Sequence, residues 1–509
     1  SDEDLALCLS MLSSTHAAKG NGDKAVEYEA RALEIFKKTG DEGDIKSCYS
    51  DLGHAYYVKR EYLQSIEYYQ KSLSYGVPEG EPLPQQPDIL LGMAYDYHQL
   101  GNYNEALSRL DSALSALRYA RPVHPDSLAN RILAYRSLLL KATILADKYD
   151  AGDKEVAYLQ HAGELLSDAL SIILSRIGAF YQDKNKLAFY RLAVEGNARA
   201  IEVYSRLYSA THNPDWLRQT FEFAEINKSL LLYQMVLENK ARMKFTVPDS
   251  LSADEEMLRQ NIAETEIALS GLSSKPLPVA SSDSIQDRLF ALKNRYDLLR
   301  RDIEAVCPDY FAAASAFPHE NIRTIQSGLL DDSTGLVEYF TSDSMLCIFL
   351  LRSDTFFFHQ TRIDSLLKKQ VNEMRWGLYG YFTARERTPA LYLQTMRAYV
   401  ENAAALYQLL IAPLANYFPP KLVIIPDGVL GYLPFEALLS GHSERPDRFQ
   451  RLPYLLRKYD ISYCFSAALL REMKAMVPGR ANDNLLAVAP FYEGPDIGNN
   501  LPADRTSMH

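Results

Sequence analysis

The sequence is poor in cysteine and has no long apolar run. Its five cysteines stand far apart and none belongs to a CxxC pair, which excludes a disulfide framework and fits a reducing compartment. No stretch of 18 apolar residues occurs, so the sequence predicts no membrane span. The acidic start, SDEDLALC, has no signal-peptide pattern. We therefore expect a cytoplasmic protein with no membrane partner.

Positive charge and nucleotide or metal motifs are also scarce. Lys and Arg number 54 against 65 Asp and Glu, which gives a net charge of −11. The sequence shows no basic patch, so we expect no nucleic-acid partner. No GxGxxG, Walker A, HExxH or GxSxG pattern is present. The repeat-region histidines lack metal-ligand spacing; they are His16, His54, His98 and His161. We expect no cofactor and no metal.

What the chain does contain is an internal repeat near its N-terminus. Three segments align at their small and large apolar positions, with Leu12, Leu52 and Leu91 at intervals of 40 and 39 residues. Small residues allow two helices of a hairpin to approach closely, and Leu and Tyr fill the space beside them. The pattern predicts three helical hairpins, and it resembles the tetratricopeptide repeat (TPR) with its L-G-x2-Y and A-x6-A spacing.

Further helices follow the repeats, and strands replace them after residue 310. Helices are expected at 127–149, 156–180, 186–210 and 215–241, and a charged hairpin at 252–270 and 284–305. GLVEYF, MLCIFLL and TFFFHQ predict a three-strand antiparallel meander. Helices and strands alternate after this meander, which predicts an α/β sheet with parallel strands. The expected elements are helices at 363–382 and 390–416, a strand LVIIP, a helix at 434–440, a strand at 460–465, a helix at 466–477 and a strand at 484–489.

Residues 421–439, KLVIIPDGVLGYLPFEALL, are the most informative stretch. Asp427-Gly428 after a strand predicts a tight turn, because Gly tolerates positive φ. Pro434 suits the first turn of a helix, where its missing N–H is not needed. Taken alone, the stretch is a strand, a turn and a helix.

Together with its flanks, this stretch resembles the CHAT family of caspase-like domains, which are found attached to TPR arrays. The family pattern IPDG-x-L-x-x-LPFEAL matches residues 425–438, with signature positions that we expect to be structural: Pro426, Asp427, Gly428, Leu433, Pro434, Phe435 and Glu436. Upstream, FAEINKSLLLYQMVL is similar to the family's AE-x-x-K-x-x-x-L helix. Downstream, RKYDISYCFSAALL and NLLAVAPF are similar to its following elements. Gly431 departs from the polar residue of many members.

The resemblance implies a three-part architecture. Residues 1–245 are expected to form an α-helical TPR-like solenoid, and residues 246–310 a long helical hairpin that acts as a linker. Residues 311–509 are expected to form the N-terminal part of an α/β caspase-like CHAT domain, incomplete at its C-terminus.

The resemblance also implies a cysteine peptidase whose repeats bind a partner or activator. In the family pattern, the catalytic His and Cys end two strands downstream of the NLLAVAPF-like strand, so we expect this chain to lack the dyad and to be inactive alone. A pair of Cys464 with His442 is an alternative, but packing of Cys464 as a small apolar group is favoured. The other functional reading is a non-catalytic TPR scaffold with a degenerate CHAT-like domain.

A TPR array binds peptides or helices on the groove lined by its first helices. If Leu52 and Leu91 occupy the same repeat position, the groove residues are His54, Tyr57, Met93, Asp96 and Tyr97. Tyr and Met suit an adaptable binding surface for a protein or peptide. The alternative is that this face is merely solvated.

Overall fold

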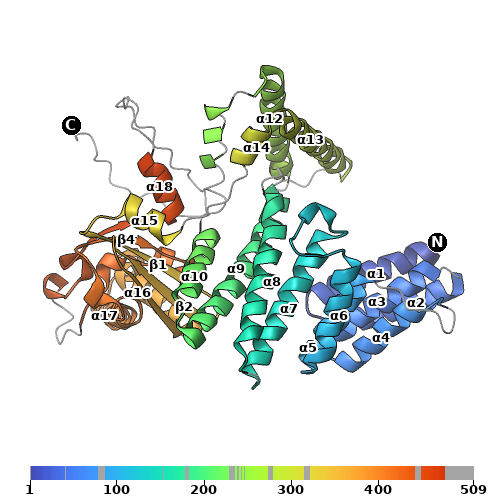
Figure 1. Ribbon diagram of the computed structural model, residues 1–509, viewed down its shortest axis with the longest axis horizontal. Helices are drawn as coiled ribbons and strands as arrows, with labels where there is room; N and C mark the ends of the chain where they lie inside the picture. The colour runs from blue at the N-terminus through green and yellow to red at the C-terminus, as the bar shows by residue number, and fades with distance from the viewer. Residues whose placement is uncertain are drawn as a thin grey trace.

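The computed structural model describes residues 2–39, 42–77, 86–152, 154–177, 183–228, 236–237, 240–241, 243–245, 247–272, 279–314, 321–441 and 449–475. Figure 1 shows a row of helices that leads from the N-terminus to a sheet at the opposite end of the molecule. A separate hairpin, α12 (Asp249–Leu272) with α13 (Val279–Val306), stands beside this row, and the short α14 (Pro308–Ala314) follows it.

The repeats form the helical hairpins that the sequence predicts. The first three are α1 (Asp2–Ala18) with α2 (Gly22–Thr39), α3 (Glu42–Val58) with α4 (Tyr62–Ser74), and α5 (Pro87–Gln99) with α6 (Tyr103–Ala116). The array continues through α7 (Arg131–Asp150), α8 (Val156–Ile177), α9 (Asp183–Thr211) and α10 (Pro214–Asn227). Gly20 and Gly101 adopt positive φ in the hairpin turns, where a Cβ would be strained. The helix expected at 215–241 ends earlier, at Asn227.

Tyr69 of α4 shows how the small residues position neighbouring repeats. Its ring inserts between Gly53 of α3 and Gly92 of α5. A Cβ built on Gly53 would lie 2.7 Å from a ring carbon, and one built on Gly92 would lie 2.6 Å from another. The two glycines therefore create the slot that the large aromatic fills, as the repeat pattern predicts.

Replacing Gly53 with alanine should destabilise the array by about 1–3 kcal/mol, because the added methyl overpacks a filled contact. Gly328→Ala is the matched control, since a Cβ there meets nothing within 4 Å on the helix α15 (Ile322–Leu329). The control should keep wild-type stability or gain up to about 1 kcal/mol from helix propensity. Urea unfolding followed by far-UV circular dichroism makes the comparison; equal stability of Gly53→Ala and wild type would contradict this packing.

The sheet has five strands in the order β3-β2-β1-β4-β5. The strands are β1 (Thr334–Thr341), β2 (Met345–Leu351), β3 (Phe356–Arg362), β4 (Lys421–Ile425) and β5 (Asp460–Tyr463). β1, β2 and β3 form the predicted antiparallel meander, whereas β4 runs parallel to both β1 and β5. The result is a mixed sheet whose second strand is buried along its whole length.

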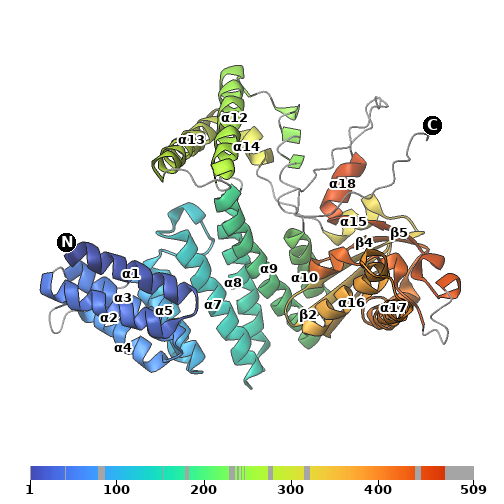
Figure 2. The ribbon, with the colours of Figure 1, turned by 180° about the vertical axis from the view of Figure 1, so that it is seen from behind.

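Helices cover both faces of this sheet (Figure 2). Residues such as Tyr339 and Ile348 face α16 (Ser365–Thr383) and α17 (Pro389–Leu410) in one core. The alternate residues, such as Phe340 and Phe349, face α9, α10, α15 and α18 (Ala467–Ala475) in another. Since α9 and α10 also pack into the core of α7 and α8, the last pair of the helical row is at the same time a layer of the sheet domain.

The prediction of a helix at 434–440 is wrong. The chain instead forms two short 3₁₀ turns, Gly428–Tyr432 and Phe435–Ala437, and then pairs Leu439 with Tyr454 in a single β-bridge. Tertiary partners replace helical ones here: the N–H of Leu439 donates to the carbonyl of Ala403 in α17, and the carbonyl of Leu438 accepts from the N–H of Leu455. The strand expected at 484–489 lies outside the described residues.

Candidate functional site

The loop after β4 carries the signature residues, and its turn is fixed to the end of β1. One carboxylate oxygen of Asp427 accepts hydrogen bonds from the backbone N–H of Thr341 at 2.7 Å and from its hydroxyl at 2.9 Å. Gly428 follows with φ +51°, and a Cβ there would come within 3.0 Å of that hydroxyl. The Asp-Gly pair is therefore required by both the conformation and the close approach of β1.

The other oxygen of Asp427 forms a buried ion pair with Lys228, which follows the end of α10. The Nζ–Oδ1 distance is 2.8 Å, and the side chains of Lys228 and Asp427 are only 4% and 17% exposed. The same ammonium donates to the carbonyl of Tyr339 at 2.6 Å and to that of Pro426 at 3.3 Å. Three acceptors match the three donors of a lysine, so the buried charge is compensated and hydrogen-bonded.

One turn earlier, Glu225 reaches a second element of the sheet domain. Its two carboxylate oxygens accept from the N–H groups of Ala467, at 2.9 Å, and Ala468, at 3.1 Å. These are unsatisfied donors of the first turn of α18, which also carry the positive end of the helix dipole. The hydroxyl of Ser466, directly before α18, accepts from the N–H of Leu469 and caps the same turn. α10 therefore helps to hold the N-terminus of α18.

Glu338 of β1 completes a charged group at this junction. It is fully buried, and neither of its carboxylate oxygens has a hydrogen-bond partner of good geometry. Burial raises the pKa of Glu338 well above its usual value, and the nearby carboxylates of Glu225 and Asp427 raise it further, while Lys228 lowers it. Its environment therefore favours the protonated, neutral form of Glu338 over the carboxylate. We call Glu225, Lys228, Glu338 and Asp427 the junction cluster.

The remaining signature residues pack the loop rather than offer reactive groups. Leu433 and Phe435 are buried in the core shared with α16 and α17. The hydroxyl of Tyr463 accepts from the N–H of Phe435 at 2.9 Å and donates to Glu436 at 2.6 Å. Pro434 precedes the 3₁₀ turn with φ −77°. These contacts fix the loop in place, and the structural role of its signature residues stays a prediction.

The predicted groove residues separate into two groups. His54 is exposed and Tyr57 and Tyr97 are half-buried, so these three can meet a partner. Met93 and Asp96 are only 2% and 0% exposed, and assigning them to a binding groove was wrong. Asp96 turns inward because it accepts from the hydroxyl of Ser65 at 2.7 Å, and burial raises its pKa to about 7.

The alternative catalytic pair receives no support from Cys464. Its side chain is buried in the core between the sheet and α10, and its Sγ lies 3.3 Å from the carbonyl of Ser466. His442 lies outside the described residues. Within the described part of the chain, no hydrogen bond joins a histidine to a cysteine, and no three His, Cys, Asp or Glu residues are grouped as a metal site.

Two family models match the chain. The CHAT domain matches residues 400–493, which include β4, the signature loop, β5 and α18, and a tetratricopeptide repeat matches residues 5–39. The chain carries tetratricopeptide repeats and a CHAT domain. No curated protein matches it.

Among solved structures, this TPR–CHAT chain is similar to TPR proteins. A putative kinesin light chain repeat protein from Podosopora anserina shares 17% identity over 44% of this chain and 96% of its own, with a TM-score of 0.30. A TPR protein from Parabacteroides merdae shares 14% over 62% and 100%, with a TM-score of 0.24. YrrB, described as a TPR protein with an unusual peptide-binding site, shares 14% over 42% and 89%, with a TM-score of 0.22.

The junction cluster is the feature that sequence reasoning did not assign. Glu225 and Lys228 stand in the AE-x-x-K pattern of the TPR–CHAT resemblance, and Asp427 stands in IPDG. The two motifs are about two hundred residues apart, so their contact could not be read from spacing. The signal that was present is a pair of unlike charges at i and i+3 on an apolar helix, since charges on a buried face need partners elsewhere.

Proposed function

We propose that this chain belongs to a TPR-regulated, caspase-like cysteine protease of the CHAT type, in which a protein partner bound by the repeats controls the CHAT domain. The observation that carries the proposal is the position of α10. One side of this helix packs into the core of α7–α9 and the other into the core of the sheet. A change of helix packing in the array therefore reaches the sheet through a shared element.

The junction cluster provides specific contacts for such control. Lys228 donates hydrogen bonds to the carbonyls of Tyr339 in β1 and Pro426 after β4, and it pairs with Asp427. Glu225 accepts from the first N–H groups of α18. A small shift of α10 would alter all of these contacts together. A partner that binds one position of α10 more tightly than another would thus bias the signature loop and α18.

The protease activity is proposed from the family resemblance, which places the catalytic His and Cys after the NLLAVAPF segment. The gene sequence that follows codon 509 is the direct test. A strand that ends in His, followed by one that ends in Cys, supports a protease. A stop codon there would reject the activity while leaving partner binding open.

Partner binding is proposed for the face formed by His54, Tyr57 and Tyr97. We expect the double variant Tyr57→Ala, Tyr97→Ala to lose at least about tenfold in affinity for a partner purified with wild type, because partly buried tyrosines dominate interface energy. Tyr379→Ala, an exposed tyrosine of α16, is the control and should bind as wild type does. Isothermal titration with the purified partner measures both; equal affinity for all three proteins would reject this face. The division of the chain into a repeat array (1–245), a helical hairpin linker (246–310) and a CHAT domain (311–509) is likewise part of this proposal.

A further inference from the structure

The outer edge of the sheet is formed by β3, and half of its backbone groups point away from the sheet. The N–H of Ile363 donates to Ser344 and the N–H of Arg352 donates to Thr355. With the register of β2 and β3, these bonds direct the N–H and C=O groups of Phe357, His359 and Thr361 toward β2. The groups of Phe358, Gln360 and Arg362 therefore point outward, and no described residue bonds to them.

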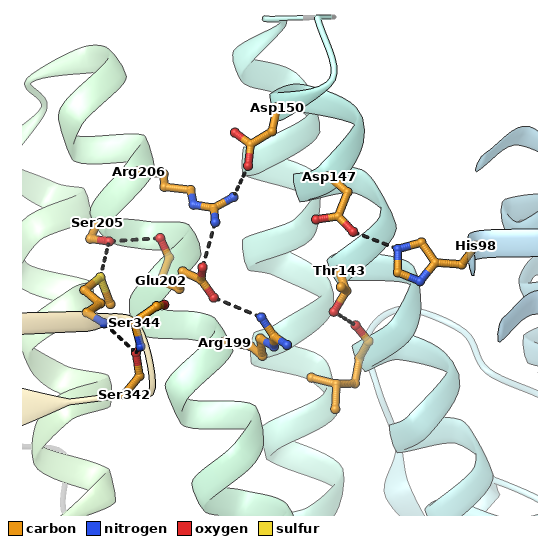
Figure 3. Close-up of polar contacts among 12 residues, drawn as sticks. His98, Thr143, Asp147, Asp150, Arg199, Glu202, Ser205, Arg206, Ser342 and Ser344 are labelled. Atoms are coloured by element: carbon orange, nitrogen blue, oxygen red, sulfur yellow. Dashed lines mark hydrogen bonds and ion pairs between the residues drawn. The ribbon is translucent and has the colours of Figure 1, made fainter. Parts of the chain in front are cut away.

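A cleft of about 600 Å³ lies beside this edge. It is formed by the end of α7, one face of α9, the start of β2 and the end of β3, with Asp150, Glu202, Arg206, Ser344, Gln360 and Arg362 in its lining. Figure 3 shows Arg206 reaching from α9 to the carboxylate of Asp150, with Ser342 and Ser344 on the neighbouring strand turn. The cleft therefore joins the helical row to the free strand edge.

The carboxylates of the cleft are already neutralised. Asp150 pairs with Arg206 at 2.8 Å, and Glu202 pairs with Arg206 at 2.6 Å and with Arg199 at 3.1 Å (Figure 3). Arg362 differs, because its side chain is exposed and it forms no ion pair within the described part of the chain. Among the described lining residues, Arg362 is thus the charged side chain that no ion pair engages.

We propose that the β3 edge is a second docking site, where an extended segment of an acidic partner protein adds a strand to the sheet. Its backbone pairs with the outward groups of Phe358, Gln360 and Arg362, and an Asp or Glu side chain of the segment binds the guanidinium of Arg362 in the cleft. Main-chain bonds supply affinity and the carboxylate supplies specificity. The site is separate from the repeat face, so it can exist whether or not that face binds a partner.

The first test is amide exchange in the free chain, resolved by residue. The outward amides of Phe358, Gln360 and Arg362 should exchange at least about a hundredfold faster than those of Phe357, His359 and Thr361. Slow exchange at the outward amides would overturn the proposal, because it would show that another part of this chain covers the edge. Protection that appears only as the concentration rises, together with a dimer in light scattering, would assign the edge to a second copy and likewise overturn it.

The second test selects random twelve-residue peptides on the wild-type chain and measures the purified peptides by fluorescence anisotropy. We expect enriched peptides to contain Asp or Glu, to protect the outward β3 amides, and to bind Arg362→Gln at least about tenfold more weakly. Gln360→Pro removes one outward donor without touching the β2 ladder and should also weaken binding. Arg385→Gln, on an exposed loop, is the control. Peptides that bind Arg362→Gln and Gln360→Pro as tightly as wild type would overturn the proposal.

Discussion

Replacing Lys228 with methionine is expected to lower the free energy of unfolding of the CHAT domain by about 3–5 kcal/mol, because it removes one partner of a buried ion pair. The substitution leaves Asp427 without its counter-charge and leaves the carbonyls of Tyr339 and Pro426 without a donor. A methionine fills nearly the same space, so the loss reports the charge and hydrogen bonds rather than a cavity.

Urea unfolding measures this loss, and a double-mutant cycle with Asp427→Asn separates the pair from the other contacts of each residue. The exposed pair of Lys71 with Glu67 provides the control, and Lys71→Met should cost less than about 1 kcal/mol. A coupling energy below about 0.5 kcal/mol between positions 228 and 427 would contradict the role given to the junction cluster.

Replacing Glu338 with glutamine should make the protein more stable at neutral and alkaline pH and remove part of its pH dependence. The pKa of Glu338 is raised in the folded state from its ordinary value of 4.5, so the folded chain keeps a proton that the unfolded chain releases. The contribution of protonated Glu338 to the free energy of unfolding is therefore fully present below about pH 4.5. It is lost as the pH rises toward the folded-state pKa, by up to about 1.4 kcal/mol per pH unit. Glutamine mimics the neutral acid and has no proton to lose.

The measurement is the urea unfolding free energy at several pH values between 4.5 and 8.5. The advantage of Glu338→Gln over wild type should grow with pH in this window. Glu386→Gln, an exposed residue of the α16–α17 loop, should follow wild type throughout. A constant difference between Glu338→Gln and wild type would show that Glu338 is charged when folded, against the environment described for it.

Local sequence patterns predicted much of the fold because local physics determines those elements. The alternation of small and large residues in the repeats indicated close helix packing, and Gly53 and Gly92 do meet the ring of Tyr69. Short apolar runs predicted β1 and β2, since a strand buried on both faces needs no alternation. The 3₁₀ turns in place of a helix at 434–440 depend on hydrogen bonds with α17 and with Leu455, which no local pattern contains.

The candidate site was less predictable because its contacts join distant parts of the sequence. Asp96 was assigned to a groove from its repeat position, yet its side chain faces Ser65 in the preceding repeat. Lys228 and Asp427 stand in motifs that were recognised separately, and only the fold brings their charges together. Repeat position indicates which helix a residue belongs to, whereas burial depends on the next helix against which it packs.

Control of the CHAT domain by the repeats depends on the shared layer formed by α9 and α10. The chain has two tryptophans, and the helices that carry them cover opposite faces of the sheet. Trp216 is in α10 and stacks on Tyr204 of α9, and Trp376 is in α16. Each can be observed alone by fluorescence in the variants Trp376→Phe and Trp216→Phe.

The most direct measurement is therefore the urea unfolding curve of each single-tryptophan variant, with and without Lys228→Met. If α10 is a layer of the sheet domain, Trp216 and Trp376 should report coincident transitions, and Lys228→Met should move both midpoints down together. A Trp216 transition that is separate from that of Trp376, or that ignores Lys228→Met, would contradict the shared layer.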